Sequence, residues 1–504
     1  MTNEMAKKQA LYAKKVANRK LSGSLEFTTS RLGWQVSAAL ALVFWFFARK
    51  GAMVWMAVAT IYTVAALLQY VICKRIIKEV TGEANAVSPA TRKMGWLLLP
   101  FVCVGDFFLF ISGCMLIKNN KNLEYQLSVY STLVSIFIII VSMLNLFKDT
   151  LSDTFWLGIG LYGLYTVLNV IVMQAVRKYT FGKKPDKKFL PYAYISVAGL
   201  ALGNVFSFLL GIVALGKYYN KNEEVNVEWI DVIRRLFRNY MSTIGMFIVI
   251  FLLSVSIASN LTFEYSIAID NNFATRLAAP SLMYPFGCDD FGRCVFTRII
   301  FGARISLLVG MISTVLPCLV GGMLGAIAGY YGGKTDNIIM RCLDVLAAVP
   351  GILLAIAIIA ALGVSTVNLI LSLSIGGISG YARTVRAQVL GVANQEFVEA
   401  AKACGAKDGT IIFKHIIPNS LAPVIVRVTM GMGSAVLSTS SLSYLGIGVE
   451  AHVPEWGNIL KAGSKFLETH PYIAIFPGIA IVIIVLSFNF FGDGLRDALD
   501  PKLK

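Results

Sequence analysis

The sequence predicts an all-α, polytopic membrane protein. Apolar residues make up 57% of its 504 residues and charged residues only 14%, and the mean hydropathy is +0.70. Several apolar stretches run for about twenty residues, the length that a helix needs to cross a bilayer. The net charge of +17 suits lysines and arginines that gather in cytoplasmic loops during insertion. We therefore expect a lipid bilayer, and not nucleic acid, as the partner of this charge.

Twelve candidate spanning segments follow one another along the chain, six in each half. The first half offers residues 33–48, 52–73, 94–117, 125–147, 155–176 and 190–216. The second half offers residues 240–260, 302–330, 338–362, 366–388, 418–446 and 471–491. Twelve spans would place both ends of the chain on the same side of the membrane.

These segments divide the chain into four parts. Residues 1–32 form a basic, cytoplasmic tail without an apolar run, so we expect no cleavable signal peptide. Residues 33–216 form a membrane extension of unassigned role, in which we expect the deep acidic residue Asp106 to hydrogen-bond a neighbouring helix or face a wet crevice. Residues 217–239 are polar and then amphipathic, which suits either an interfacial elbow or a plain linker. Residues 240–504 form a second membrane domain.

The distribution of Lys and Arg predicts the topology. In the second half it places the loop around 383–414 in the cytoplasm and the loops at 261–301 and 447–470 outside. In the first half the loops at 74–93 and 177–189 are both strongly basic, yet three expected helices separate them. Either one of these segments does not span the membrane, or the 177–189 loop breaks the rule.

A short polar island over residues 396–418 interrupts the apolar second half. Glu396 and Glu399 fall in the first turn of an expected helix, where the helix dipole favours negative charge. Gly405 can end that helix in a left-handed conformation. Pro418 suits the first turn of the next membrane helix.

The same short helix carries an apolar stripe that suits a partner's groove. Phe397, Ala401 and Cys404 recur at i, i+4 and i+7 on one face, and Ala400 keeps that face small. Taken alone, this pattern also fits a surface amphipathic helix with a glycine cap.

The island and four further stretches resemble one permease subunit of dipeptide, oligopeptide or nickel ABC importers. EAAKACGAKDGTIIFKHIIP, at 399–418, is similar to the EAA loop of that family. The other matching stretches lie, in the family's order and spacing, at 285–310, 328–350, 443–460 and 492–504. The resemblance covers slightly more than half of the chain. It implies a type I ABC importer permease core of about six helices, here preceded by about six extra transmembrane helices.

The resemblance also implies roles for two sets of residues. The ATPase-coupling loop, which docks into a groove on an ATP-hydrolysing subunit, contains Glu396, Phe397, Glu399, Ala400, Ala401, Gly405, His415, Ile417 and Pro418. The external loop that faces a docked substrate-binding protein contains Pro454, Glu455, Trp456 and Gly457.

A transport subunit of this family has no catalytic residues, metal or cofactor of its own. The resemblance implies two separate ABC ATPase subunits that bind ATP and magnesium, a second permease subunit and an extracytoplasmic binding protein, all at a bacterial inner membrane. The run from Gly211 to Tyr218 nearly matches a phosphate-binding loop, but Tyr218 stands where Ser or Thr should hold magnesium.

The implied substrate is a dipeptide or an oligopeptide, with nickel or another small solute as the alternative. An ion-gradient-driven secondary transporter would instead show matching broken helices in the two halves, and the sequence shows no such self-similarity. A membrane scaffold or sensor centred on residues 1–216 would leave the motifs of the second half unused.

The external motif departs from the family at two positions. The family usually has Gly-Thr-Asp-x-x-Gly-Arg-Asp, but Cys288 replaces the Thr and Cys294 replaces the last Asp. Because disulfides persist outside the cytoplasm, we hypothesise a Cys288–Cys294 bond that contributes at most about 2 kcal/mol. Two independent thiols are the alternative.

Two features of the second half concern helix shape. Close helix–helix approach, through ordinary tight packing or in a gating role, is favoured by Gly310, Gly321, Gly322, Gly325 and Gly329. Pro350, inside the segment 338–362, should kink that helix because it removes one backbone hydrogen bond.

Overall fold

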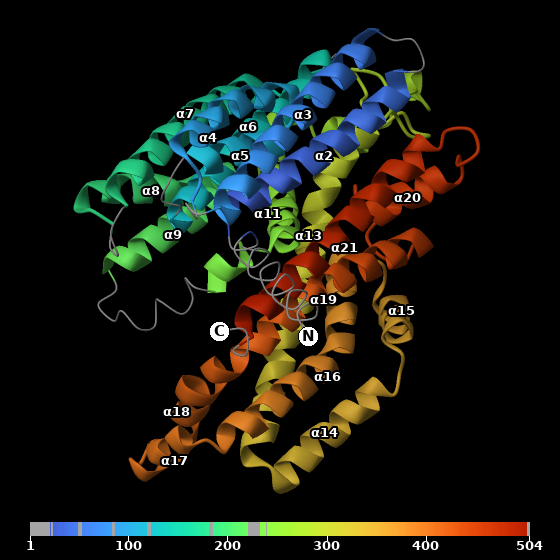
Figure 1. The fold of residues 1–504 in the computed structure, drawn as a ribbon. Helices are drawn as coiled ribbons and strands as arrows, with labels where there is room; N and C mark the ends of the chain where they lie inside the picture. The colour runs from blue at the N-terminus through green and yellow to red at the C-terminus, as the bar shows by residue number, and fades with distance from the viewer. Residues whose placement is uncertain are drawn as a thin grey trace, which may run out of the picture. The chain divides into compact units, whose positions relative to one another are not determined.

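Figure 1 shows the chain as a computed structural model. The structure describes residues 21, 24–48, 53–82, 86–117, 122–148, 150–180, 185–219, 232–237 and 239–500. Within these ranges the regular structure is helical apart from one isolated β-bridge between Cys288 and Cys294, which confirms the all-α prediction. Most of the predicted N-terminal tail and of the predicted elbow lies outside the described residues. The chain divides into two compact units.

The first unit comprises Met1–Ile136, Tyr165–Leu200 and Phe206–Tyr240. The helices that lie in it wholly or in part are α2 (Leu25–Ala48), α3 (Met53–Thr81), α4 (Pro89–Lys93), η1 (Met94–Val104), α5 (Phe107–Ile117), α6 (Leu123–Met143), α7 (Phe155–Tyr179), η3 (Lys187–Phe189), α8 (Leu190–Ala198), η4 (Gly199–Leu202) and α9 (Val205–Tyr219). Buried side chains of α3, η1 and α5 form an apolar core that includes Ile72, Leu98 and Leu109.

The segment 94–117, expected to be one span, folds back on itself. The 3₁₀-helix η1 ends at Gly105, whose φ of 86° is readily adopted only by glycine. The chain then returns as α5. A Cβ atom added to Gly95 would lie 2.8 Å from the carbonyl oxygen of Gly113, so η1 and α5 pack with their backbones almost in contact. The prediction of a single span is therefore wrong for this segment.

Asp106 holds this turn. Its carboxylate accepts a hydrogen bond from the N–H of Leu109 at 3.2 Å, which caps the start of α5. It accepts another from Ser37 Oγ of α2 at 2.5 Å. Asp106 is thus satisfied by hydrogen bonds within its bundle, which confirms the expected contact with a neighbouring helix.

The fold-back explains the two basic loops of the extension. With η1 and α5 returning to the side from which they start, only α6 and α7 cross between residues 74–93 and 177–189. Crossing of the membrane by α6 and α7 alone would place both loops on one side, as the positive-inside tendency requires. The fold thus favours the first of the two alternatives, in which one predicted segment does not span.

The segment 190–216 also turns back instead of forming one span. α8 and η4 lead to Gly203, with a φ of 77°, and α9 begins at Val205. A Cβ atom on Gly211 of α9 would lie 2.7 Å from the carbonyl oxygen of Ala193 in α8. The two arms of this second hairpin therefore pack closely against each other.

The second unit comprises Phe137–Leu164, Ala201–Val205 and Met241–Lys504. Besides the adjoining ends of α6 and α7, its helices are η2 (Leu144–Phe147), α11 (Tyr240–Thr262), α12 (Ser266–Ile269), η5 (Phe273–Thr275), α13 (Val295–Tyr331), α14 (Gly333–Ala347), α15 (Gly351–Leu362), α16 (Thr366–Ala393), α17 (Glu396–Ala403), α18 (Asp408–Thr410), the π-helix η6 (Ile411–Ile416), α19 (Ile417–Leu445), α20 (Trp456–Ser464) and α21 (Tyr472–Leu499). A strip of the predicted extension, residues 137–164, therefore packs with the second domain.

α13 crosses α16 through the predicted glycines. Cβ atoms on Gly321 and Gly325 would lie 2.4 Å from the carbonyl oxygen of Ile378 and 2.2 Å from that of Ala382. The two backbones therefore touch where side chains are missing, and tight packing explains these two glycines. Gly322, on a neighbouring face of the same helix, has room for a Cβ atom.

Pro350 marks a sharp break, as predicted. α14 and α15 on its two sides are bent by 78°. Two ion pairs then hold α14 to α16: Asp336 with Arg386 at 2.5 Å, and Asp344 with Arg383 at 2.8 Å. Both α14 and α15 contact α16, so the break changes the direction of the chain while both of its arms stay packed on that helix.

Seven helices in the described part of the chain are long and apolar enough to cross a membrane, or eight if the bent pair of α14 and α15 forms one span. The sequence predicted twelve. The difference arises partly from the two hairpins, since each uses an apolar run of spanning length to enter and return.

Candidate functional site

The helix of the polar island is α17, and a fully buried apolar side chain anchors it to the unit. Gln395 precedes it in an extended conformation, and the exposed residues Glu396 and Glu399 lie in its first turn, as the sequence predicts. Val398 is fully buried in an apolar cluster that includes Ile411. The acidic first turn thus faces solvent while Val398 anchors the helix from beneath.

Gly405 ends α17 in the left-handed conformation that the sequence predicts, with a φ of 76°. Its N–H donates to the carbonyl oxygen of Lys402 at 2.9 Å, and the N–H of Ala406 donates to that of Ala401 at 3.1 Å. These two bonds form a Schellman motif. A Cβ atom on Gly405 would meet nothing within 4 Å, so the backbone conformation, and not lack of space, requires glycine here.

The exposed apolar stripe of α17 differs by one residue from the predicted one. Phe397, Ala400 and Cys404 are exposed, and Phe397 has 37% of its surface accessible. Ala401 is half-buried against the cluster that holds Val398, because it lies three residues after Val398 on the same face of the helix. Ala400 therefore completes the stripe available to a partner, and Ala401 belongs to the internal packing.

A polar anchor ties the loop after α17 to the end of α13. The hydroxyls of Tyr330 and Tyr331 donate to the two carboxylate oxygens of Asp408 at 2.7 and 3.3 Å. The ammonium of Lys402 lies 5.1 Å from the centroid of the Tyr330 ring, a cation–π contact. Sequence reasoning missed Asp408, although the paired tyrosines gave a signal that this helix end has a polar neighbour.

The helix that follows the loop begins earlier than expected. α18, η6 and α19 form one continuous run, Asp408–Leu445, of 38 residues. His415 lies in its π-helical turn, and Ile417 and Pro418 open α19 directly after that turn. Pro418 thus lies in the first turn of α19 as predicted, but inside a helical run that starts at Asp408.

The four external residues expected to face a binding protein are buried. Pro454, Glu455, Trp456 and Gly457 all lie inside the second unit, with Glu455 and Trp456 at 0% exposure. Exposed residues beside them in the same loop include Ala451, His452, Leu467 and Glu468. A protein that docks on this loop would meet the second group and not the first.

Hydrogen bonds explain this burial. Glu455 caps α20 by accepting from the N–H groups of its first turn, and its carboxylate also accepts from Ser306 Oγ at 3.1 Å and Ser440 Oγ at 2.9 Å. Trp456 Nε1 donates to the carbonyl oxygen of Ile299 at 3.0 Å. These contacts join α13, α19 and α20 into one external frame.

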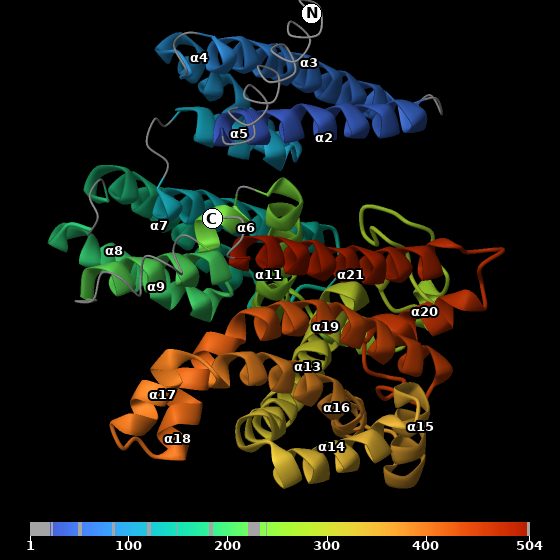
Figure 2. The same cartoon turned by 60° about the horizontal axis from the view of Figure 1, so that its bottom comes forward.

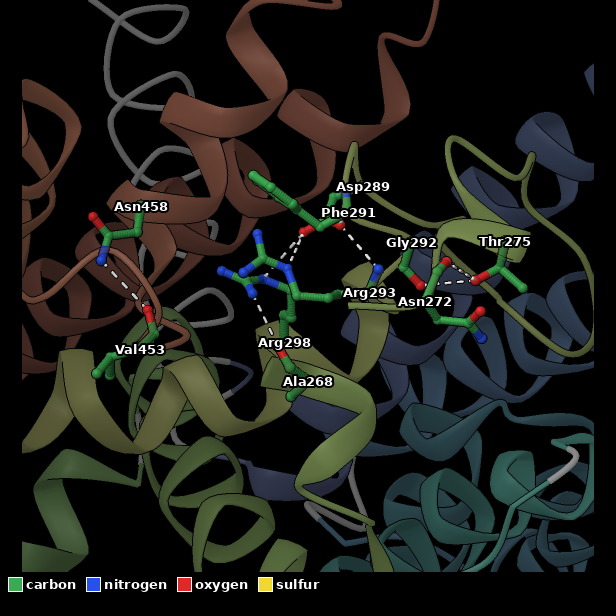
Figure 3. A network of polar contacts seen from close by, with 10 residues as sticks. All are labelled: Ala268, Asn272, Thr275, Asp289, Phe291, Gly292, Arg293, Arg298, Val453 and Asn458. Carbon is green, nitrogen blue, oxygen red and sulfur yellow. Dashed lines mark hydrogen bonds and ion pairs between the residues drawn. The ribbon is translucent and has the colours of Figure 1, made fainter. Parts of the chain in front are cut away.

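A buried ion cluster lies at the start of α13 (Figure 3). Asp289 accepts a hydrogen bond from Arg293 Nε at 2.8 Å and two more from the backbone N–H groups of Phe291 and Arg293. Arg298 Nε lies 3.7 Å from the same carboxylate, and Arg298 Nη1 donates to the carbonyl oxygen of Ala268 at 2.9 Å. The cluster fixes the external loop before α13 to α12 and α13.

Cys288 and Cys294 pair across the β-bridge beside this cluster. Both have no accessible surface, and both are free thiols in the structure. Burial raises the pKa of Cys288 to about 12. Lys148, a buried residue between α6 and α7 that sequence reasoning did not single out, donates to Thr297 Oγ1 at 2.6 Å next to the cysteines. Burial lowers the pKa of Lys148.

The sequence-predicted residues therefore gather at two opposite ends of the second unit. Figure 1 and Figure 2 both place α17 and α18 at one end, and α15 and α20 at the other. α13 and the run Asp408–Leu445 extend between these ends. Among the described residues, no three His, Cys, Asp or Glu side chains gather closely enough to hold a metal ion. The arrangement is suited to transmitting movement between its ends.

Two family models match the chain. The model of binding-protein-dependent transport system inner membrane components matches residues 321–504. The model of the N-terminal transmembrane domain of oligopeptide transport permease C matches residues 228–280. Both matches lie in the half of the chain that contains α17 and the external frame.

Individual relatives match slightly more than half of the chain. The dipeptide transport system permease protein DppC of Alkalihalophilus pseudofirmus is 45% identical over 276 residues, which cover 55% of this chain and 90% of that protein. The glutathione transport system permease proteins GsiD of Pectobacterium atrosepticum and of Escherichia coli O6:K15:H31 are 38% and 40% identical over 284 residues, which cover 56% of this chain and 94% of each relative.

Proposed function

This chain belongs to the permease family of binding-protein-dependent dipeptide and oligopeptide transport systems, and on that premise we propose that it forms half of the pathway of an ATP-driven peptide importer. It is a multi-pass membrane protein, which we assign to a bacterial inner membrane. A second permease subunit completes the pathway, two ABC ATPase subunits bind ATP and magnesium, and an extracytoplasmic binding protein delivers the peptide.

The observation that carries this proposal is the way in which α17 is held. Its exposed stripe of Phe397, Ala400 and Cys404 is free to enter a groove. Val398 anchors the helix from beneath, and Asp408 fixes the following loop to α13. A helix held in this way moves together with α13 and α19 when an ATPase partner pushes on it.

The helical run Asp408–Leu445 can transmit that movement to the external side of the membrane. Its 38 residues correspond to about 57 Å at 1.5 Å per residue, enough to cross the hydrocarbon core with several turns to spare. Near its far end Ser440 donates to Glu455 of the external frame. Displacement of α17 would therefore shift the external frame through one continuous helix, as alternating access requires.

We propose a short peptide as the cargo because the relatives are named for dipeptide and glutathione transport, and glutathione is itself a short peptide. The competing cargo is nickel or another small solute. Proteoliposomes that contain the purified importer and its binding protein distinguish the two. ATP-dependent uptake of a labelled dipeptide supports the peptide assignment. Uptake of nickel without uptake of the dipeptide contradicts it and favours nickel as the cargo.

Co-purification tests the proposed assembly. The tagged chain is extracted gently from its native membrane, and the proteins that accompany it are identified by mass spectrometry. We expect a second permease and one or two ATPases with phosphate-binding loops. A chain that is recovered alone and transports in response to an ion gradient would contradict the proposal and favour a secondary transporter.

A further inference from the structure

We propose that Cys288 and Cys294 form a disulfide that closes the external loop in front of α13. Both are free thiols in the structure, so the bond is inferred from how the chain pairs them. It is independent of the peptide assignment and requires only that this loop lie outside the cytoplasm, as the distribution of Lys and Arg predicts.

The backbone places the two cysteines at a site suited to a disulfide. The N–H of Val295 donates to the carbonyl oxygen of Gly287, and that of Asp289 donates to the carbonyl oxygen of Arg293, both at 3.0 Å. These bonds flank the cysteines, which are therefore a non-hydrogen-bonded antiparallel pair. Such pairs have Cα atoms about 4.5 Å apart, within the range that a disulfide spans.

The turn between the cysteines is ordered without the bond. Gly292 adopts a φ of 77°, and Asp289 Oδ1 accepts from the N–H groups of Phe291 and Arg293 at 3.0 and 2.9 Å. The two thiols are consequently held opposite each other before any covalent link exists. Oxidation would then need little backbone movement.

Cys294 also occupies a position where a capping side chain would be more favourable. Cys294 occupies the N-cap position of α13, but its side chain makes no capping hydrogen bond. A side-chain carboxylate or hydroxyl would be the better partner for a helix N-terminus. Cys294 lacks this capping bond and instead faces Cys288 across the bridge, which suits a covalent link.

Because both cysteines are buried, we expect the disulfide not to exchange with other thiols in the folded protein. Neither cysteine is accessible, and burial raises the pKa of Cys288 to about 12, so few thiolates are available for exchange in the folded protein. We infer that the bond forms during folding. The two thiols lose two protons and two electrons to an external disulfide oxidant, which is reduced to two thiols.

Peptide mapping of the full, unreduced chain tests the bond. The protein is denatured, alkylated with N-ethylmaleimide and digested with trypsin, which cleaves after Arg276, Arg293 and Arg298. We expect peptides 277–293 and 294–298 as one linked species that separates on reduction. Cys342 and Cys404, which are exposed, serve as internal controls and should be alkylated. Alkylation of both Cys288 and Cys294 before reduction would overturn the proposal.

A stability cycle provides a second readout. Cys288→Ala, Cys294→Ala and the double variant are compared by thermal unfolding in detergent. If the residues act only through one shared bond, the double variant should unfold at about the temperature of either single variant, because each change removes the same link. Losses that add in the double variant would indicate two independent thiols.

Discussion

Lys148, from the N-terminal extension, donates a 2.6 Å hydrogen bond to Thr297 Oγ1 in the first turn of α13. Lys148 is 8% exposed and Thr297 is fully buried. Two neighbouring contacts support this one: Ser142 Oγ donates to Thr262 Oγ1 at 2.9 Å, and Asn145 Nδ2 donates to the carbonyl oxygen of Thr262 at 2.8 Å. The strip 137–164 is thereby fastened to both α11 and α13 at the external end of the second unit.

Removing the Thr297 hydroxyl, which accepts the hydrogen bond from Lys148, should therefore lower the stability of the folded protein. We expect Thr297→Val to destabilise the protein by roughly 1.5–3 kcal/mol, because a buried ammonium then loses its hydrogen bond. Lys148→Met combined with Thr297→Val should recover much of that loss, because the pair is replaced by apolar groups of similar shape. Thermal unfolding of the four proteins in detergent measures the coupling. Additive effects would mean that the two residues do not interact.

The buried lysine also predicts a pH dependence. Burial lowers the pKa of Lys148 from its ordinary value of 10.5. Below the folded-state pKa, Lys148 is charged in both the folded and the unfolded protein, and folding bears the full free-energy penalty of burying the ammonium. Between the folded-state pKa and the ordinary value only the unfolded chain holds the proton, so stability rises with pH. The unfolding temperature of the wild type should therefore gain more, or lose less, than that of Lys148→Met between pH 7 and alkaline pH. Equal shifts in the two proteins would contradict this.

The close crossing of α13 and α16 predicts a steric effect with an internal control. Gly325→Ala places a Cβ atom 2.2 Å from the carbonyl oxygen of Ala382, so the helices must separate. We expect a loss of roughly 1–3 kcal/mol. Gly322→Ala, whose Cβ atom lies 3.7 Å from Val385, should be nearly neutral. The unfolding temperatures of the two variants measure this difference. Equal losses of stability in Gly325→Ala and Gly322→Ala would contradict the proposed crossing.

The left-handed glycine of the Schellman turn predicts a variant, Gly405→Asp, in which ATP hydrolysis no longer drives peptide uptake. Gly405→Asp forces a side chain into the left-handed conformation, at roughly 1 kcal/mol, and adds a carboxylate at the end of the coupling helix. We expect normal assembly and continued ATP hydrolysis, with peptide uptake reduced roughly tenfold, a loss of about 1.4 kcal/mol in coupling. Gly391→Asp is the matched control, because Gly391 is an exposed helical glycine with open space. Wild-type uptake by Gly405→Asp would refute the coupling role.

Local features of the second half were predictable from the sequence because they depend on neighbouring residues. Gly405 adopts a left-handed backbone conformation because glycine has no Cβ atom, and Pro350 breaks its helix because proline has no backbone N–H to donate. The hairpins were missed because hydrophobic length alone does not reveal a turn inside an apolar run. Both turns nevertheless have the same signal, a left-handed glycine followed by a polar residue: Gly105–Asp106 and Gly203–Asn204.

Contacts between distant parts of the sequence were beyond sequence reasoning. Lys148 and Thr297 lie 149 positions apart, and nothing in either local pattern indicates the other. Glu455 and Trp456 likewise read as exposed loop residues until Ser306, Ser440 and Ile299 are brought beneath them. Their burial arises from tertiary packing.

Photo-crosslinking from α17 is the most direct test of the central claim that this helix docks on an ATP-hydrolysing partner. A photoreactive amino acid is placed at Phe397, which is 37% exposed, and, as a control, at Tyr444 near the opposite end of α19, which is 41% exposed. Illumination of native membranes should join position 397, and not position 444, to a protein with a phosphate-binding loop, identified by mass spectrometry. Crosslinking of position 397 only to lipid or to this chain would contradict the account.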